Sequence, residues 1–216
     1  LNALVVGNPT GMSYYSRRTG ETRFGSSLPG AEVEAAYVDS LFPKSQLLCG
    51  EQASVNSLRV HLSDASILHL ATHGILDQEA PLLSAILLAD GTQMNVADLV
   101  GIHLNAELVV MSACNTARGE VTGGNDVLGL TRALLAAGAR AVLVSLWPVS
   151  DGATILLMAE FYRRLVQQSE PPAQALKNAQ HYLRNLTAEQ ITTEFSLIHA
   201  QINNAACNEF QIDRQR

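Results

Sequence analysis

A cysteine and a histidine each stand just after a run of apolar residues in this chain. Cys114 comes shortly after the apolar residues 108–111, and His73 comes shortly after the largely apolar run 67–71. An imidazole can take the proton of a thiol, whose thiolate form is the nucleophile, and can later return that proton to a leaving amine. These residue types therefore predict nucleophilic catalysis, with Cys114 attacking a carbonyl carbon and His73 acting as general base and then acid.

The residue that follows the histidine fits the same chemistry. Gly74 has no side chain, so its backbone N–H can approach a developing oxyanion closely, and the backbone N–H of Cys114 would be a second donor. Removing one such donor typically costs about 2.7–4 kcal/mol of transition-state stabilisation. We therefore expect Gly74 and Cys114 to form an oxyanion hole.

These residues can meet only if the segments before them are neighbouring strands. Short continuous apolar runs bounded by turn residues are typical of buried strands, and the chain has such runs at 3–7, 67–74, 108–111 and 141–147. The carboxyl ends of parallel strands share one edge of a sheet, which is where open α/β folds bind ligands. We expect His73 and Cys114 to face each other there, with side chains about 4–7 Å apart.

The remaining segments supply helices and turns. Helical patterns occupy 30–41, 54–62, 96–100, 126–137, 151–168 and 173–184, with Ser54, Asn95 and Asp151 as expected N-caps. Residues 85–94 predict a small β-hairpin that turns at Asp90-Gly91, whereas residues 11–30 predict a long exposed loop. Strands that alternate with helices predict an α/β fold, in which a mostly parallel sheet has helices on both faces.

Composition limits the classes of function. The chain has 216 residues, 47% of them apolar and 16% charged, which is typical of a soluble globular protein. The net charge of −6 gives no support for nucleic-acid binding, and no apolar run reaches the roughly 18 residues of a membrane span. Three cysteines, an odd number, favour a reducing, cytoplasmic compartment, with Cys49 and Cys207 structural or incidental. Because the chain starts without methionine, we expect it to be a piece of a longer protein.

Several motifs in order resemble one known family. They are Leu-His-Leu-Ala-Thr-His-Gly at 68–74, Val-Val-Met-Ser-Ala-Cys-Asn-Thr at 109–116, Val-Leu-Gly-Leu-Thr-Arg-Ala at 127–133, Ala-Gly-Ala-Arg at 137–140 and Ser-Leu-Trp-Pro-Val-Ser-Asp at 145–151. Together they resemble the CHAT family, caspase-like cysteine peptidases that are related to separases and commonly attached to TPR repeats. The resemblance implies a caspase-like fold over residues 1–186, with residues 187–216 as a helical extension or tail of the same domain.

The resemblance also implies a protein or peptide substrate and some of its contacts. The segment around Ser145 and Trp147 would pair main chain to main chain with an extended substrate. Asp151 would help select a basic residue before the cleaved bond, although capping its helix explains it equally well. Asp126 is a weaker candidate for the same pocket, because helix capping accounts for it. TPR repeats outside this chain are the expected regulatory partner.

No cofactor or metal is expected. His69 and His73 are four residues apart, but on a strand, at about 3.3 Å per residue, their Cα atoms lie about 13 Å apart, too far to share an ion; His69 is therefore expected to be a core histidine. The resemblance implies no third catalytic carboxylate, so backbone or neighbouring groups would orient His73. The alternative function is a catalytically silent caspase-like signalling or scaffold domain, which the intact His73-Gly74 and Cys114 disfavour. A small-molecule hydrolase or nucleotide binder is disfavoured because the chain has no G-x-S-x-G elbow and no phosphate-binding glycine pattern.

Overall fold

The fold is built on a parallel sheet of five strands. The computed structural model describes residues 1–17, 19–75, 77, 80–112, 127–145 and 149–213. Its central sheet has the strand order β10-β9-β5-β1-β4, and all four neighbouring pairs are parallel. The strands are β1 (Ala3–Pro9), β4 (Ser45–Gly50), β5 (Ile67–Ala71), β9 (Leu108–Met111) and β10 (Val142–Val144).

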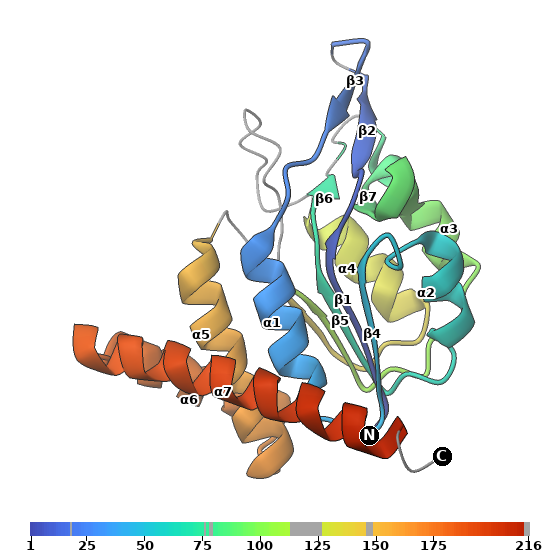
Figure 1. The fold of residues 1–216 in the computed structure, drawn as a ribbon. Helices are drawn as coiled ribbons and strands as arrows, with labels where there is room; N and C mark the ends of the chain where they lie inside the picture. The colour runs from blue at the N-terminus through green and yellow to red at the C-terminus, as the bar shows by residue number, and fades with distance from the viewer. Residues whose placement is uncertain (18, 76, 78–79, 113–126, 146–148, 214–216) are drawn as a thin grey trace.

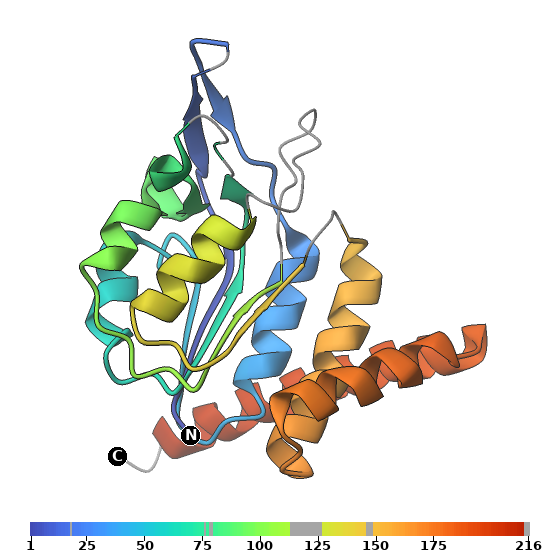
Figure 2. The ribbon, with the colours of Figure 1, turned by 180° about the vertical axis from the view of Figure 1, so that it is seen from behind.

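Helices cover both faces of this sheet, as predicted (Figures 1 and 2). Side chains alternate along β1, so that Leu4 and Val6 pack in one core cluster while Ala3 and Val5 pack in another. The first cluster includes residues of α2 (Val55–His61), α3 (Val96–Val100) and α4 (Val127–Ala136). The second includes residues of α1 (Pro29–Asp39), α5 (Asp151–Tyr162) and α6 (Pro172–Arg184).

Of the predicted helix caps, Asp126 lies outside the described residues, and two of the other three are confirmed. The side chain of Ser54 accepts from a backbone N–H of α2, and Asn95 forms a capping box with Asp98 in α3. The prediction for α5 is wrong by one residue, because Ser150 is the N-cap and Asp151 is the first helical residue. An acidic residue in the first turn is still favourable for the helix dipole. The helix then continues as a π-helix over Arg163–Gln167.

The prediction of a long loop over residues 11–30 is wrong. Strands β2 (Ser13–Ser16) and β3 (Glu21–Phe24) pair antiparallel and form a ribbon, which projects away from the central sheet (Figure 1). Tyrosine, threonine and phenylalanine favour strands, but neither strand shows a buried apolar face, so hydrophobic periodicity gives no signal. We call residues 13–24 the β2–β3 ribbon.

The predicted hairpin is confirmed and gains a third strand. β7 (Ala85–Leu87) and β8 (Gln93–Asn95) pair antiparallel around a turn in which Asp90 and Gly91 have positive φ. The short strand β6 (Gly74–Ile75) adds to β7 on the other side. A 3₁₀ turn, Pro81–Leu83, lies between β6 and β7.

The last helix, α7 (Ala188–Asp213), crosses the end of the molecule opposite the β2–β3 ribbon (Figure 1). Its Ile198 is completely buried in a cluster with Tyr37 of α1 and Ile155 of α5. Glu194 pairs with Arg163 at 3.0 Å and accepts a 2.7 Å hydrogen bond from the hydroxyl of Tyr182. Across the described parts of the chain, no helix has the length and apolar character needed to cross a membrane.

Candidate functional site

The two strands that carry the predicted catalytic residues are neighbours. β5 and β9 pair in parallel, with Leu70 opposite Met111, and the backbone N–H of Ser112 still donates to the Leu70 carbonyl at 3.2 Å. His73 lies between β5 and β6 and is only 3% exposed. Its own carbonyl accepts a hydrogen bond of 2.9 Å from the N–H of Leu87. The backbone of His73 is therefore held on one side by β5 of the central sheet and on the other by its hydrogen bond to β7.

A backbone carbonyl orients the imidazole of His73. The Nε2 atom lies 2.8 Å from the carbonyl oxygen of Ser26, while the Ser26 hydroxyl is at a longer 3.5 Å. A carbonyl can only accept, so the short contact requires the proton on Nε2. In the neutral ring Nδ1 is then the unprotonated nitrogen, which makes Nδ1 the atom that can take a proton. The prediction that backbone or neighbouring groups orient this histidine is confirmed.

The Ser26 carbonyl is itself held in place by close packing. The N–H of Gly25 donates to the Met12 carbonyl at 2.9 Å. A Cβ atom on Gly25 would stand 2.9 Å from Cδ2 of His73 and 3.1 Å from Cβ of Met12, so only glycine allows this approach. Thr72, next to His73, donates its hydroxyl hydrogen to the Leu87 carbonyl at 2.8 Å.

Asn8, at the end of β1, fixes the segment on the other side of Ser26. Its side-chain oxygen accepts from the N–H of Leu28 at 2.7 Å, and its amide donates to Glu32 at 3.0 Å. Its φ of 45° lies in the left-handed region, which asparagine tolerates better than most residues. None of Asn8, Gly25 and Ser26 was singled out from the sequence. The tolerance of asparagine for positive φ, at the end of a buried strand, is the signal that could have indicated Asn8.

The environment keeps the imidazole of His73 neutral. Burial lowers its pKa from the ordinary value of 6.5, against smaller opposing effects from the Ser26 carbonyl and the charge of Asp151. Asp151 therefore lies close enough for its charge to act on the ring. Its Cβ would be 2.8 Å from a Cβ on Gly30, so the N-terminal turns of α1 and α5 meet here. A neutral imidazole is the form that a general base requires.

The backbone N–H of Gly74 is not used by the neighbouring strand. Gly74 lies opposite Ile86 where β6 pairs with β7. The next pair, His73 and Leu87, is hydrogen-bonded, because the N–H of Leu87 donates to the carbonyl of His73. Because bonded and non-bonded pairs alternate in an antiparallel ladder, the N–H of Gly74 points away from β7. Among the described residues, a Cβ on Gly74 would meet no atom closer than the Ala85 carbonyl at 3.9 Å, which is ordinary contact. Packing against these residues therefore does not require glycine at this position.

The other predicted site residues divide into two groups. Ser145 directly follows β10, and its hydroxyl donates to the Ser112 carbonyl at 3.2 Å, which ties the end of β10 to the end of β9. Cys114, Asp126 and Trp147 lie outside the described residues, so their predicted roles remain predictions. Within the described ranges no three His, Cys, Asp or Glu side chains gather as metal ligands.

His69 lies in the core, as predicted, in contact with two other polar side chains. Its Nδ1 is 3.1 Å from the hydroxyl of Tyr162 on α5, and its Nε2 is 3.1 Å from a carboxylate oxygen of Glu34 on α1. The contact with Glu34 has the distance of an ion pair but lacks hydrogen-bond geometry. All three side chains are buried. Burial, and then the charge of Glu34, raises the pKa of Tyr162 well above its ordinary range, so the phenol stays protonated.

Comparisons with known proteins agree with the motifs. A family model described as the CHAT domain matches residues 1–208. Tetratricopeptide repeat protein 28 of Mus musculus is 30% identical over 206 residues, and the match covers 76% of this chain and 8% of that protein. The protein of the same name from Homo sapiens is 29% identical over 201 residues, with the same two shares. The chain thus spans a small part of the curated relatives that it matches. With its α/β fold, its ordered motifs and this match, the chain belongs to the CHAT domain family.

Proposed function

We propose that this domain is a cysteine endopeptidase in which His73 and Cys114 form a catalytic dyad. The register of β5 and β9 carries the proposal. Leu70 lies opposite Met111, His73 follows Leu70 by three positions, and Cys114 follows Met111 by the same three. Two parallel neighbouring strands in this register bring residues at equal offsets to the same edge of the sheet.

In the proposed reaction, Nδ1 of His73 takes the proton of the Cys114 thiol. The sulfur attacks the carbonyl carbon of the scissile peptide bond, and the imidazolium then gives its proton to the leaving amine nitrogen. Water hydrolyses the resulting thioester, again with Nδ1 as base. The Ser26 carbonyl, which accepts from Nε2 at 2.8 Å, keeps the ring in the required tautomer throughout and stabilises the imidazolium.

The proposed oxyanion hole consists of the N–H groups of Gly74 and Cys114. Two observations support Gly74: its N–H points away from β7, and the described residues around it leave room for a larger side chain. A glycine that packing against these residues does not require is explained by the close approach of a substrate oxygen.

Asp151 is proposed to favour a basic residue before the cleaved bond. It is exposed, lies in the first turn of α5, and acts electrostatically on His73. Ser150 rather than Asp151 occupies the N-cap position of this helix, so capping does not account for Asp151, although a carboxylate in the first turn also favours the helix dipole. The segment around Ser145 and Trp147 is proposed to pair with the substrate main chain, and Asp126 remains a second candidate for the pocket.

The names of the relatives support a regulatory partner for this domain. Both are called tetratricopeptide repeat proteins, and the proposal is that TPR repeats, attached or on a partner, control access to the site. Residues 1–186 would form the peptidase domain, residues 187–216 its helical extension, and the cytoplasm its compartment.

Digestion of an unbiased peptide library tests the proposed function. The protein, together with any partner domain that it requires, is compared with its Cys114→Ala and His73→Gln forms. The proposal predicts cleavage at a restricted set of sequences, with a basic residue before the bond, and loss of cleavage by about 10³-fold or more in both variants. Cleavage that survives Cys114→Ala would contradict the dyad, whereas no cleavage by any form would support a silent scaffold domain instead.

A further inference from the structure

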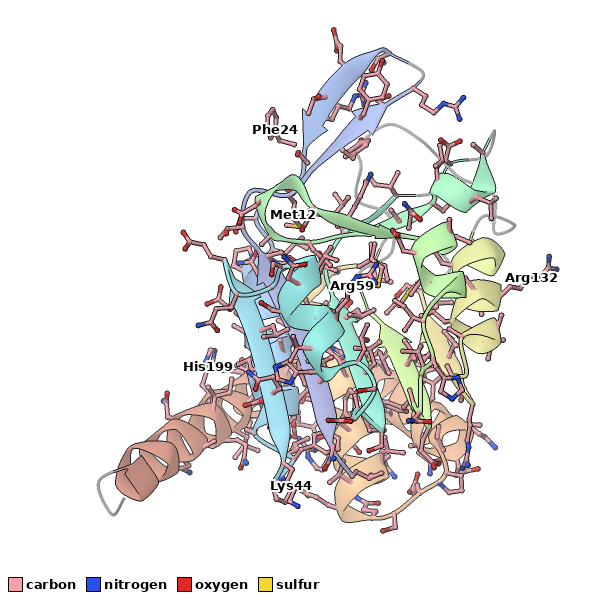
Figure 3. The ribbon with its side chains drawn as sticks, turned by 90° about the vertical axis from the view of Figure 1, so that its right-hand side faces the viewer. Met12, Phe24, Lys44, Arg59, Arg132 and His199 are labelled. Carbon is pink, nitrogen blue, oxygen red and sulfur yellow. The ribbon has the colours of Figure 1, made fainter. Side chains whose placement is uncertain are left out.

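Two aromatic side chains on the β2–β3 ribbon are exposed on the same face. Ser13 lies opposite Phe24 and Tyr15 lies opposite Thr22, so Tyr15 and Phe24 are diagonal neighbours. Phe24 is 80% exposed and Tyr15 is 62% exposed. Figure 3 shows Phe24 on the projecting ribbon and Met12 at its base. Aromatic side chains gathered on one exposed face are typical of a binding surface.

The base of the ribbon is fixed to the residues around the candidate site. Before β2, the Met12 carbonyl accepts from the N–H of Gly25 at 2.9 Å, and the Met12 sulfur lies 3.3 Å from the Thr72 hydroxyl oxygen. The turn after β7 also holds it, since the N–H groups of Asp90 and Gly91 donate to the carbonyls of residues 10 and 11. The ribbon is thus a platform with a defined position relative to His73.

The distance from this platform to the reacting atoms is short. Phe24 precedes Ser26 by two residues, so their Cα atoms are at most about 7 Å apart. The Ser26 carbonyl is 2.8 Å from Nε2 of His73. At about 3.3 Å per residue, an extended polypeptide would pass the face of Tyr15 and Phe24 about four to six residues away from its cleaved bond.

The charge of the ribbon indicates which kind of polypeptide it would bind. Residues 13–24 contain three arginines and one glutamate, whereas the whole chain has a net charge of −6. Arg17, close to Tyr15 in sequence, is exposed. Arg23 lies opposite Tyr14, on the other face of the ribbon, and is half-buried. Arginine beside aromatic rings fits an acidic, aromatic or apolar peptide segment. A nucleic acid is the less suitable occupant, because its phosphates would be repelled by the rest of an acidic protein.

We infer that the β2–β3 ribbon is a substrate-docking surface outside the catalytic site, which binds an aromatic or apolar residue flanked by acidic residues about four to six positions from the cleaved bond. The inference rests on the proposed peptidase function, because it assigns that function its substrate class. The surface is Tyr15 and Phe24, with the neighbouring Arg17 supplying the charge.

Peptides of two lengths test this inference. A well-cleaved core of about eight residues is compared with peptides of about 16 residues, long enough to reach the ribbon, that carry either Phe with flanking Asp or Ser with flanking Lys at the distal positions. The enzyme forms are the unchanged protein, Phe24→Ser and Tyr15→Ser. Val60→Ser is the control, since Val60 is 70% exposed but lies on α2.

The expected result is that distal Phe and Asp raise kcat/KM about tenfold through a lower KM, and that Phe24→Ser and Tyr15→Ser remove most of this gain. Cleavage of the core peptide should stay unchanged in all forms. The inference is overturned if the distal residues have no effect, or if Phe24→Ser slows the core peptide equally, since the ribbon would then act on His73 and not on substrate. Preferential binding of a single-stranded oligonucleotide that Phe24→Ser abolishes would overturn it as well.

A binding assay keeps this test separate from the test of peptidase function. A fluorescent form of the long acidic-aromatic peptide is titrated with the Cys114→Ala protein and with the same protein carrying Phe24→Ser. If no form cleaves any peptide, the proposed function fails, yet binding of this peptide that Phe24→Ser weakens about tenfold still supports the ribbon as a docking surface. Equal binding by the two proteins contradicts it.

Discussion

The hydrogen bond between Nε2 of His73 and the Ser26 carbonyl decides which ring nitrogen can take a proton from a thiol. It spans 47 positions of sequence and depends on the absence of a side chain at Gly25, where a Cβ would stand 2.9 Å from the imidazole. A displacement of about 1 Å in a catalytic group can cost about 10²-fold in rate. Gly25 is therefore a positioning residue, although it has no functional group of its own.

Gly25→Ala should reduce kcat/KM by about 10- to 100-fold, because the new methyl group pushes the ring away from the Ser26 carbonyl. Steady-state cleavage of a peptide substrate measures this. The control is Gly129→Ala, since Gly129 is inside α4 and no atom of the described residues lies within 4 Å of where a Cβ would go, and alanine there favours the helix. If both variants keep full activity, the position of the ring does not depend on Gly25.

The charge of Asp151 should be visible in the pH dependence. It raises the pKa of His73 against the larger, lowering effect of burial. Asp151→Asn removes that contribution, so the pKa of His73 falls further and the acidic limb of the kcat/KM profile moves to lower pH. Because Asp151 is exposed, we expect a shift of less than about one pH unit. A limb that stays in place, or moves to higher pH, contradicts electrostatic contact between the two groups.

At this scale the sequence indicates the reacting groups but not the groups that hold them. His73-Gly74 and Cys114 are recognisable because each follows a buried apolar run. Ser26 contributes only its carbonyl, which every residue has, and Asn8 acts through hydrogen bonds to residues 20 and more positions away. The carbonyl of Ser26 leaves no pattern in residue type or spacing, and the asparagine at position 8 indicates a left-handed turn but not the partners that its side chain binds.

Among the elements, α1, β5 and α5 are joined by the buried contacts of Glu34, His69 and Tyr162. The ring of Tyr162 also packs edge-on against Phe42 and Phe161. Tyr162→Phe keeps these ring contacts and removes the hydroxyl, which leaves Nδ1 of His69 without that partner in the core. We expect a loss of about 1–3 kcal/mol in the free energy of unfolding.

Urea denaturation measures this loss as a lower midpoint at unchanged slope. Tyr15→Phe is the matched control, because the Tyr15 side chain is exposed and its hydroxyl can stay hydrated, so the midpoint should hardly move. Equal stability of Tyr162→Phe and the unchanged protein would show that the hydroxyl contributes nothing to the core.

The sequence predicted strands correctly where both faces of the strand are buried. The strands β1, β5 and β9 are continuous apolar runs because both faces of each are covered by helices. The β2–β3 ribbon was missed because it is solvated, and its strands have no buried stripe to reveal their period. Strand β6 was missed because two residues are too few to show any pattern.

For the whole molecule, the question is whether α7 unfolds together with the sheet. Ile198 is fully buried against α1 and α5, whereas Leu197, its neighbour in α7, is 54% exposed. If α7 belongs to the same cooperative unit, Ile198→Ala lowers the free energy of global unfolding by about 2–4 kcal/mol, while Leu197→Ala changes it by less than about 0.5 kcal/mol. A midpoint that Ile198→Ala leaves unchanged would show that α7 is a separately unfolding extension.

The central claim is that His73 deprotonates Cys114, and the pH dependence of covalent capture tests it most directly. A peptide electrophile is reacted with the protein and with its His73→Gln form, and the modified cysteine is identified by mass spectrometry. Cys49 should be spared, because burial and then the charge of Glu32 raise the pKa of its thiol to about 11.

The account predicts that Cys114 of the unchanged protein reacts rapidly well below pH 8.5, the approximate pKa of an ordinary thiol, and that His73→Gln makes the rate follow an ordinary thiol titration. If the two forms give the same rate and the same pH profile at Cys114, then His73 does not activate that sulfur and the dyad does not exist.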